Sequence, residues 1–338
     1  MKTEDRASFY QRLITVAKKY AIPIVLLALA LFFSLKTNTF FTLYNIRNIF
    51  IQSSFTIIAG VGLAFVMISG GIDLSMGYMM SLIGIITALS ITQFGMPLAA
   101  AVAMGMVLGI ILGLFNGILV VKLKVFPLIV TLATATIFQG ISYIISQSQT
   151  VIGFPQPFIF IGQGYVWEIP FPVILTVVAV VIASFVLSKT YFGRYVYGIG
   201  GNEEAIKLAG VNVNRVRIVL YTMCGFFVSI AAIVLISRSG SASSNMGPGI
   251  EFTCLTAGIL GGISFKGGEG NVSGMVIGIL LLTVLGNGMQ LMKLGVYPQY
   301  IAKGIVLIAA VGFDTYQRNI KSKKVRVQRG NIQPQGTT

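Results

Sequence analysis

Long apolar runs, separated by short polar segments, constrain what this chain can fold into. Ten of them follow one another along the 338 residues: 20–36, 47–69, 78–94, 97–121, 125–146, 171–188, 217–237, 251–265, 271–292 and 298–316. A helix needs roughly 17 to 25 apolar residues to cross a bilayer. Since 55% of all residues are apolar and only 10% are charged, the sequence predicts an all-α polytopic membrane protein with about ten transmembrane segments. The eighth run is short and predicts a half-helix or re-entrant piece covered by protein.

The basic residues predict how the chain is oriented. With the N-terminus inside, 19 of the 24 Lys and Arg residues fall on the cytoplasmic side, as the positive-inside rule requires. We therefore expect a cytoplasmic segment at 1–19, a transmembrane permease domain at 20–316 and a basic cytoplasmic tail at 317–338. Because the net charge of +15 lies between apolar runs, it indicates membrane topology and excludes a nucleic-acid partner.

The outer loop 147–170 contains no Lys or Arg. Its Pro, Gly, Tyr and Trp residues predict an ordered surface loop with an aromatic anchor at the interface.

The residues needed for a cofactor or metal site are missing from the sequence. Histidine is absent, and the only cysteines, Cys224 and Cys254, lie within apolar runs, where packing is the expected role. The glycine-rich stretch "GGISFKGGEGN" lacks the spacing of a phosphate-binding loop. We therefore expect no metal, no cofactor and no ATP hydrolysis by this chain.

An internal repeat indicates two halves. "NGILVVKLKVFPLIV" from Asn116 and "NGMQLMKLGVYPQYI" from Asn287 align without gaps at an offset of 171 residues. On the predicted topology the first copy lies inside and the second outside, so the halves, spans 2–5 and 7–10, have opposite orientations. Inverted repeats of this kind are a recurrent transporter architecture with the pathway near the repeat interface.

Two breaks in the apolar pattern are candidate parts of a pathway or gate. "SGGIDLSMG" contains Gly70, Gly71, Asp73 and Ser75. Asp73 or Ser75 is expected to cap a helix beginning near Leu74, and the alternative is that Asp73, an ionisable group at membrane depth, contacts solute. The second break contains Gly261 and Gly262, where we expect the backbone to turn and pack closely.

The polar outer loop 237–252 carries Arg238 and Glu251. These two residues are candidates for docking a binding protein, for forming a salt bridge, or for ordering the entrance. A simple solvated loop is the alternative.

The hydrophilic loop 189–216 contains a predicted short helix, "GGNEEAIKLAG". Asn202 suits the N-cap, Glu203 and Glu204 suit the positive first turn, and Gly210 suits the C-terminal stop. Because a single short helix is marginal in water, we expect it to dock on a cytoplasmic protein, in preference to lying on lipid.

Three stretches together resemble a known family. "GGIDLSMG", "FGRYVYGIGGNEEAIKLAGVNV" and "RSGSA…GIEF…LGGISFKGGEGNVSGMVIGILLLTVLGNG" are similar to the permease subunit of bacterial ABC importers of the ribose/xylose/arabinose/galactoside/autoinducer-2 family. The resemblance runs from about residue 45 to residue 313. It implies a fold like that of type II ABC importers, a dimer with a second copy or a paralogue, and location in the bacterial cytoplasmic membrane. It also implies two partners, a separate ATPase subunit and an extracytoplasmic solute-binding protein, and a coupling role for Gly201, Asn202, Glu203, Ala205 and Gly210.

Import of a pentose, hexose or related small polar solute is the predicted function. An ABC importer for a non-sugar solute, such as a nucleoside or an autoinducer, is one alternative. A second is an ion-coupled secondary transporter or channel, but no relay of acidic residues or histidine is visible. A third, a structural membrane protein, does not account for the repeat.

Overall fold

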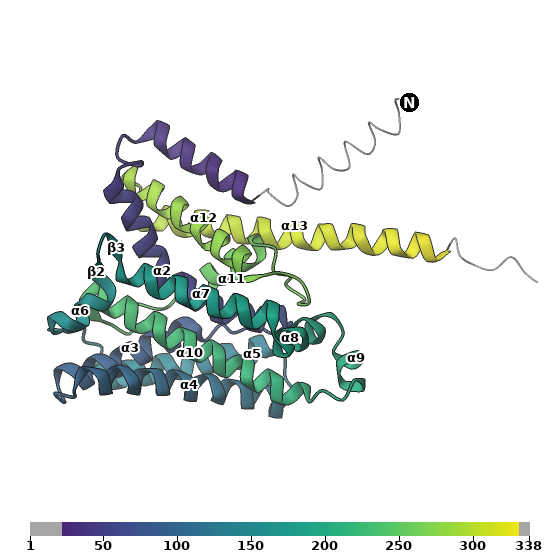
Figure 1. Ribbon diagram of the computed structural model, residues 1–338, viewed down its shortest axis with the longest axis horizontal. Helices are drawn as coiled ribbons and strands as arrows, with labels where there is room; N and C mark the ends of the chain where they lie inside the picture. Colours follow the sequence, from purple (N-terminus) through teal and green to yellow (C-terminus); the bar gives the residue numbers. More distant parts are fainter. Residues whose placement is uncertain (1–21, 331–338) are drawn as a thin grey trace, which may run out of the picture.

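The fold is a bundle of helices that run in broadly the same direction (Figure 1). The computed structural model describes residues 22–330. A first helix spans Ile22–Lys36. It is followed by α2 (Leu43–Ile68), α3 (Met76–Thr92), α4 (Leu98–Leu123), α5 (Pro127–Ser146), β1 (Val151–Ile152), α6 (Gln156–Gln163), β2 (Tyr165–Val166), β3 (Ile169–Pro170), α7 (Phe171–Lys189), α8 (Tyr191–Gly201), α9 (Glu203–Leu208), α10 (Val213–Ser239), β4 (Ser241–Ala242), α11 (Ile250–Leu260), α12 (Val272–Leu291) and α13 (Val296–Gly330).

Each predicted apolar run coincides with a helix. In the described part of the chain, six helices, α2, α4, α5, α7, α10 and α12, are long and apolar enough to cross a membrane. The chain is therefore an all-α, multi-pass membrane protein. As expected from the eighth run, α11 is short, with 11 residues. The last run was expected to end at residue 316, but the backbone of α13 remains helical to Gly330. Residues 1–21 and 331–338, which include the predicted segment 1–19, lie outside the described residues.

The predicted outer loop 147–170 is more structured than the sequence indicated. It contains α6 and three two-residue strands. Strand β1 pairs antiparallel with β4, with Val151 opposite Ala242, so this loop is joined to the start of the second outer loop. The strands are too short for an alternating pattern to reveal them in the sequence.

The core lies around α2 and α10. Their most apolar windows are 78% and 67% buried, whereas those of α4 and α7 are only 22% and 28% buried. Helices that are apolar on every side but buried on one side only are suited to face lipid. Cys224 and Cys254 are both fully buried, which confirms their predicted packing role.

Small residues allow α4 to pack closely on α10. Gly105, Gly109, Gly113 and Gly117 follow one another at four-residue spacing and are all buried. The first of them packs against α3, and the other three lie against α10. A Cβ at Gly113 would lie 3.1 Å from the Cα of Gly225 on α10 and would also meet the Tyr221 carbonyl. Since apolar burial gives no driving force between helices in lipid, such close backbone packing is a main source of helix association.

A side chain at Gly113 is therefore expected to separate α4 from α10. For Gly113→Leu, we expect a loss of about 2 kcal/mol or more, as overpacking a core usually causes, seen as a lower melting temperature of the purified protein in detergent. The matched control is Gly140→Leu on α5, where a Cβ would meet nothing within 4 Å. Equal melting temperatures for the two variants would contradict this account of the interface.

Candidate functional site

The first candidate break, residues 69–75, is a non-helical segment inside the protein. Residues 71–75 are all buried, and Gly70 has a φ of 82°, a conformation that favours glycine. Two backbone groups of the segment are satisfied by side chains from distant helices. Leu74 N donates to Thr131 Oγ1 on α5 at 3.2 Å, and Tyr221 Oη on α10 donates to the Ile72 carbonyl at 3.0 Å. Sequence reasoning missed both residues, because nothing in the local pattern links them to the break.

The predicted helix cap at this break is partly wrong. The helix α3 begins at Met76, two residues after the expected start, and its N-cap Ser75 makes no side-chain capping bond. Instead, Asp73 Oδ1 accepts from Ser75 N at 2.9 Å and from Ser75 Oγ at 2.6 Å. Asn116, the first residue of the first repeat copy, donates to Ser75 Oγ at 2.7 Å. The fully buried Asp73 keeps its other oxygen, Oδ2, without a hydrogen-bond partner among the described residues.

The predicted outer loop 237–252 is folded into the protein, so the alternative of a simple solvated loop is wrong. Ser244 is buried and lies 2.9 Å from Ser142 Oγ on α5. Gly247 N donates to Ser81 Oγ on α3 at 3.0 Å. A Cβ at Gly77, at the start of α3, would lie 2.7 Å from the Gly247 carbonyl. The end of the first break and the loop 237–252 therefore meet in the interior of the bundle.

The suggested salt bridge between Arg238 and Glu251 is not formed. Glu251 is 1% exposed, and its two carboxylate oxygens accept from Gly249 N at 2.9 and 3.0 Å, which orders the turn into α11. The Arg238 guanidinium lies 6.0 Å from the centre of the Phe55 ring. Glu251 therefore orders the turn through these hydrogen bonds, and its buried carboxylate is not presented at the protein surface.

The second candidate break, at the end of α11, turns at the predicted glycines. Gly261 is the C-cap of α11, and Gly262 has a φ of 84°. A Cβ at Gly261 would meet the backbone of Gly274 on α12. The two glycines therefore allow both the turn and the close packing expected of them.

The predicted cytoplasmic helix is present as α9. The Asn202 side chain caps it by accepting from Ala205 N at 3.0 Å, and Gly210 follows its end with a φ of 83°. The side chain of Glu203 is not free for a partner, because it pairs with Lys207 at 2.6 Å and with Arg217 on α10 at 2.8 Å. The bond from Lys207, and then the bond and charge of Arg217, lower the pKa of the Glu203 carboxyl. The exposed apolar group is Leu208, at 90%.

A second helix, α8, precedes α9 and was not predicted. Its N-cap Thr190 accepts from Gly193 N at 3.2 Å. Its composition did not predict a helix, because glycine disfavours helix interiors. The stretch contains aromatic residues and four glycines, "YFGRYVYGIGG". A threonine before an amphipathic stretch was the one available signal.

The end of α8 contacts both the break after α2 and the loop that follows the second break after α11. The contact is a junction of four glycines, Gly70, Gly200, Gly267 and Gly268. Gly267 and Gly268 have φ values of 86° and 77°. A Cβ at Gly267 would lie 3.0 Å from the Gly200 Cα, and a Cβ at Gly70 would lie 3.0 Å from the Lys266 carbonyl.

Two hydrogen bonds fix this junction. Gly268 N donates to the carbonyl of Ile68, at the end of α2, at 2.8 Å. Tyr197 Oη, on α8, donates to the Gly270 carbonyl at 2.8 Å. The loop containing α8 and α9 is thus in direct contact with the break after α2 and with the break after α11.

Comparison with known proteins identifies this arrangement as that of a transport permease. Residues 45–311 match the family described as "Branched-chain amino acid transport system / permease component", and the chain belongs to that family.

The curated relatives carry permease names. The chain is 34% identical over 320 residues to the ribose import permease protein of Haemophilus influenzae, covering 94% of this chain and 98% of that protein. It is 38% identical over 303 residues to the L-arabinose transport system permease protein of Escherichia coli, covering 90% and 92%. It is 35% identical over 291 residues to the D-allose transport system permease protein of Escherichia coli, covering 86% and 89%. The resemblance inferred from the sequence motifs is confirmed. No solved structure matches the chain.

The glycine junction predicts different effects at two neighbouring residues. A Cβ at Gly200 would collide with the Ile68 carbonyl and Gly268 N, whereas a Cβ at Gly201 would meet nothing within 4 Å. We expect Gly200→Ala to lower the melting temperature and to speed trypsin cleavage after Lys207, because α8 must move away from the breaks. Gly201→Ala should leave both quantities at parental values. If the two variants behave alike, the junction does not hold the loop.

Proposed function

We propose that this chain is the membrane-spanning subunit of an ATP-driven importer that brings a monosaccharide into a bacterial cell. It crosses the cytoplasmic membrane ten times with both termini inside. ATP hydrolysis comes from a separate subunit that docks on α9, and a solute-binding protein delivers the sugar on the outer side. The sugar class rests on the printed names of the relatives, which are permease proteins for ribose, L-arabinose and D-allose.

The placement of the loops supports the proposed topology. The α6 and β2–β3 segment lies at one end of the bundle and α8–α9 at the opposite end, where the C-terminal part of α13 also extends (Figure 1). The α8–α9 loop lies in the Lys- and Arg-rich stretch between Lys189 and Arg217, whereas residues 147–170 contain neither residue type. Positively charged loops remain on the cytoplasmic side.

Two segments that separate consecutive helices at corresponding places in the two halves, residues 69–75 and residues 240–249, support the proposed inverted repeat. In the first half the chain leaves α2 and crosses residues 69–75 before α3 begins, and in the second half it leaves α10 and crosses residues 240–249 before α11 begins. On the proposed topology the segment 69–75 starts inside and the segment 240–249 starts outside. Discontinuous helices at corresponding positions of two halves are typical of transport pathways at the repeat interface.

The observation that carries the proposal is the contact of the α8–α9 loop with the break after α2 and with the loop after α11. Gly200, at the end of α8, lies against the Ile68 carbonyl at the end of α2 and against Gly268 N, and Tyr197 Oη donates to the Gly270 carbonyl in the loop after α11. The Glu203–Arg217 pair ties α9 to the start of α10. A push on α9 by a partner is therefore transmitted to helices of both halves, which is what coupling to an ATPase requires.

Docking on α9 is proposed to involve Leu208, Ala205 and the helix cap. Leu208 is 90% exposed on the short helix, which has no buried residue of its own. An apolar side chain held out by a capped and ion-paired helix fits a groove in a partner protein. Gly201, Asn202, Glu203 and Gly210 hold the helix in place.

Uptake measurements test this function. The permease is expressed with its partner ATPase and binding protein in a bacterium without ribose, arabinose and allose importers. We expect ATP-dependent uptake of at least one of these radiolabelled sugars, insensitive to a protonophore as long as ATP is maintained. Uptake of leucine but of no sugar would contradict the sugar class, and uptake abolished by the protonophore at constant ATP would indicate ion coupling.

The double variant Ala205→Trp, Leu208→Asp tests the docking helix in the same system. We expect it to reach the membrane but to lose sugar uptake and to release the ATPase subunit during purification, because bulk and charge replace the exposed apolar surface. The matched control is Leu294→Asp, a 40% exposed leucine on the proposed outer side. Full retention of the ATPase by the double variant would show that α9 is not the docking element.

A further inference from the structure

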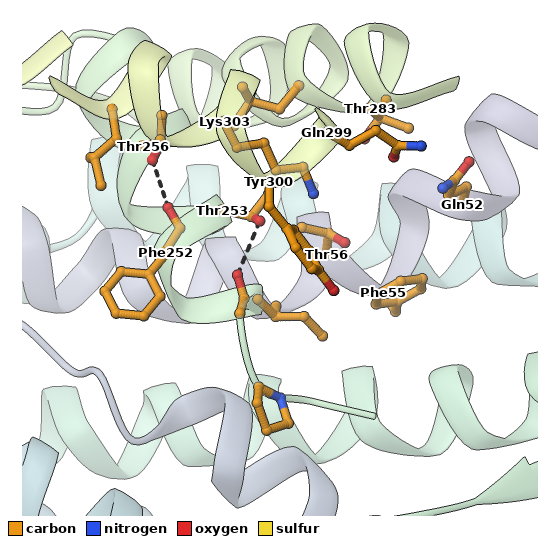
Figure 2. Close-up of a pocket in the computed structure, with 17 residues that line it drawn as sticks. Gln52, Phe55, Thr56, Phe252, Thr253, Thr256, Thr283, Gln299, Tyr300 and Lys303 are labelled. Atoms are coloured by element: carbon orange, nitrogen blue, oxygen red, sulfur yellow. Dashed lines mark hydrogen bonds between the residues drawn. The ribbon is translucent and has the colours of Figure 1, made fainter. Parts of the chain in front are cut away.

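A cavity of about 430 Å³ lies between α2, α11, α12 and α13 (Figure 2). Sites for small molecules occupy about 300–1,000 Å³, so this volume suits a single small solute. Its polar lining is contributed by all four helices and includes Gln52, Thr253, Thr283, Gln299, Tyr300 and Lys303. None of these residues was a candidate from the sequence motifs.

Several polar groups in the cavity are available to a ligand. Within residues 22–330, the side chains of Gln52, Gln299, Tyr300 and Lys303 form no hydrogen bond or ion pair. The two threonine hydroxyls donate to carbonyls of their own helices, Thr253 Oγ1 to Gly249 at 3.1 Å and Thr283 Oγ1 to Ile279 at 2.8 Å. Each threonine oxygen still has lone pairs with which to accept.

Lys303 is the most informative residue of the cavity. It is partly buried within an apolar stretch of α13. A lysine in a membrane-spanning segment is costly, is usually paired, and marks a functional site by default. Since no acidic residue lines the cavity, a partner for the ammonium has to come from a ligand or from water.

The chemistry of the lining favours a neutral polyhydroxylated solute. Amides, hydroxyls and an ammonium supply donors and acceptors from several sides, while Phe55 and Tyr300 supply aromatic surface (Figure 2). Such a mixture suits the hydroxyl groups and apolar ring faces of a sugar. A branched-chain amino acid is less well matched, because the lining offers its ammonium group no acidic partner and places the like-charged Lys303 in the same cavity.

The position of the cavity suits a solute arriving from outside. The cavity takes residues from the starts of α11 and α13, from the C-terminal part of α12, and from the N-terminal half of α2. On the proposed topology all four of these ends lie toward the outer face.

We propose that this cavity binds one neutral sugar of monosaccharide size in each protomer, with Gln52, Gln299 and Lys303 as its main hydrogen-bonding groups. This inference rests on the proposed function and assigns a solute site to it. In Figure 2 the labelled side chains of α13 lie across from those of α2. Because α2 belongs to the first proposed half and α11, α12 and α13 to the second, the solute would be held between the two halves.

Cysteine protection tests the site directly. The full-length Thr283→Cys permease is reconstituted in nanodiscs and treated with a methanethiosulfonate reagent, with D-ribose, L-arabinose, D-allose or leucine at high millimolar concentration. A ligand at about ten times its Kd leaves about a tenth of the sites free, so we expect at least one sugar to slow modification by about tenfold at saturation, and leucine to have no effect. Thr253→Cys is a second reporter in case Thr283→Cys does not fold.

Variants of the polar lining complete the test. In the same reporter background, Lys303→Met and Gln299→Leu should each abolish protection by the sugar. Lys36→Met, at an exposed lysine outside the cavity, should preserve it. Protection that survives both cavity variants, or protection by leucine alone, would overturn the proposed site.

The uptake assay separates this inference from the proposed function. If the parent chain imports a sugar while none of the sugars protects either reporter cysteine, the importer function stands and the cavity is not its solute site. If no sugar is imported and none protects, both proposals fail. Uptake together with protection that needs Lys303 supports both.

Discussion

Satisfying backbone polar groups at membrane depth is the constraint on which the rest of this structure depends. In a bilayer, non-helical backbone is tolerated only where protein covers it. Residues 71–75 are buried. Two of their backbone groups, Leu74 N and the Ile72 carbonyl, are satisfied by Thr131 from α5 and Tyr221 from α10. The outer loop is held in the same way by Ser81 from α3. The breaks therefore exist because the helices around them supply the missing partners.

This arrangement links the breaks rigidly to the α8–α9 loop, so that the neighbouring helix ends move with that loop. Gly200 of α8 packs directly on the backbone at the end of α2 and on Gly267 and Gly268 in the loop after α11. The Tyr197 side chain adds a hydrogen bond to that loop. The ion pair of Glu203 with Arg217 adds α10 to the same unit. A partner that displaces α9 thereby displaces the end of α2, the loop after α11 and the start of α10 together. On the proposed topology the opposite helix ends, where the cavity lies, stay free to respond. Rigid-body motion of one group of helices against another is a common basis of alternating access.

Local signals explain what the sequence predicted well. Apolar runs marked every long helix, and Asn202 with Gly210 marked both ends of α9, because caps and stops depend on neighbouring residues only. Contacts between distant residues explain the errors. Arg238 and Glu251 are close in sequence and opposite in charge, yet burial of Glu251 against Gly249 N separates them. The pair of Glu203 with Arg217, fourteen residues away, was likewise not visible in the local pattern, and the coupling role implied for Glu203 stays a prediction. The cavity gathers residues from four helices, and no pattern within one helix reveals it.

Spin-label distances under nucleotide trapping test the central claim, that the α8–α9 loop moves as one unit with the break after α2 and the break after α11. Labels at Leu208→Cys on α9 and Phe265→Cys in the loop after α11 report the distance within this unit. In the dimer of two copies that the family resemblance implies, Leu208→Cys alone reports the distance between the copies. Both positions are exposed, and the native cysteines are buried. When ATP is trapped on the partner ATPase, the account predicts a constant distance from 208 to 265 and a changed distance between the two 208 positions. A change in the 208–265 distance as large as that between subunits would contradict it.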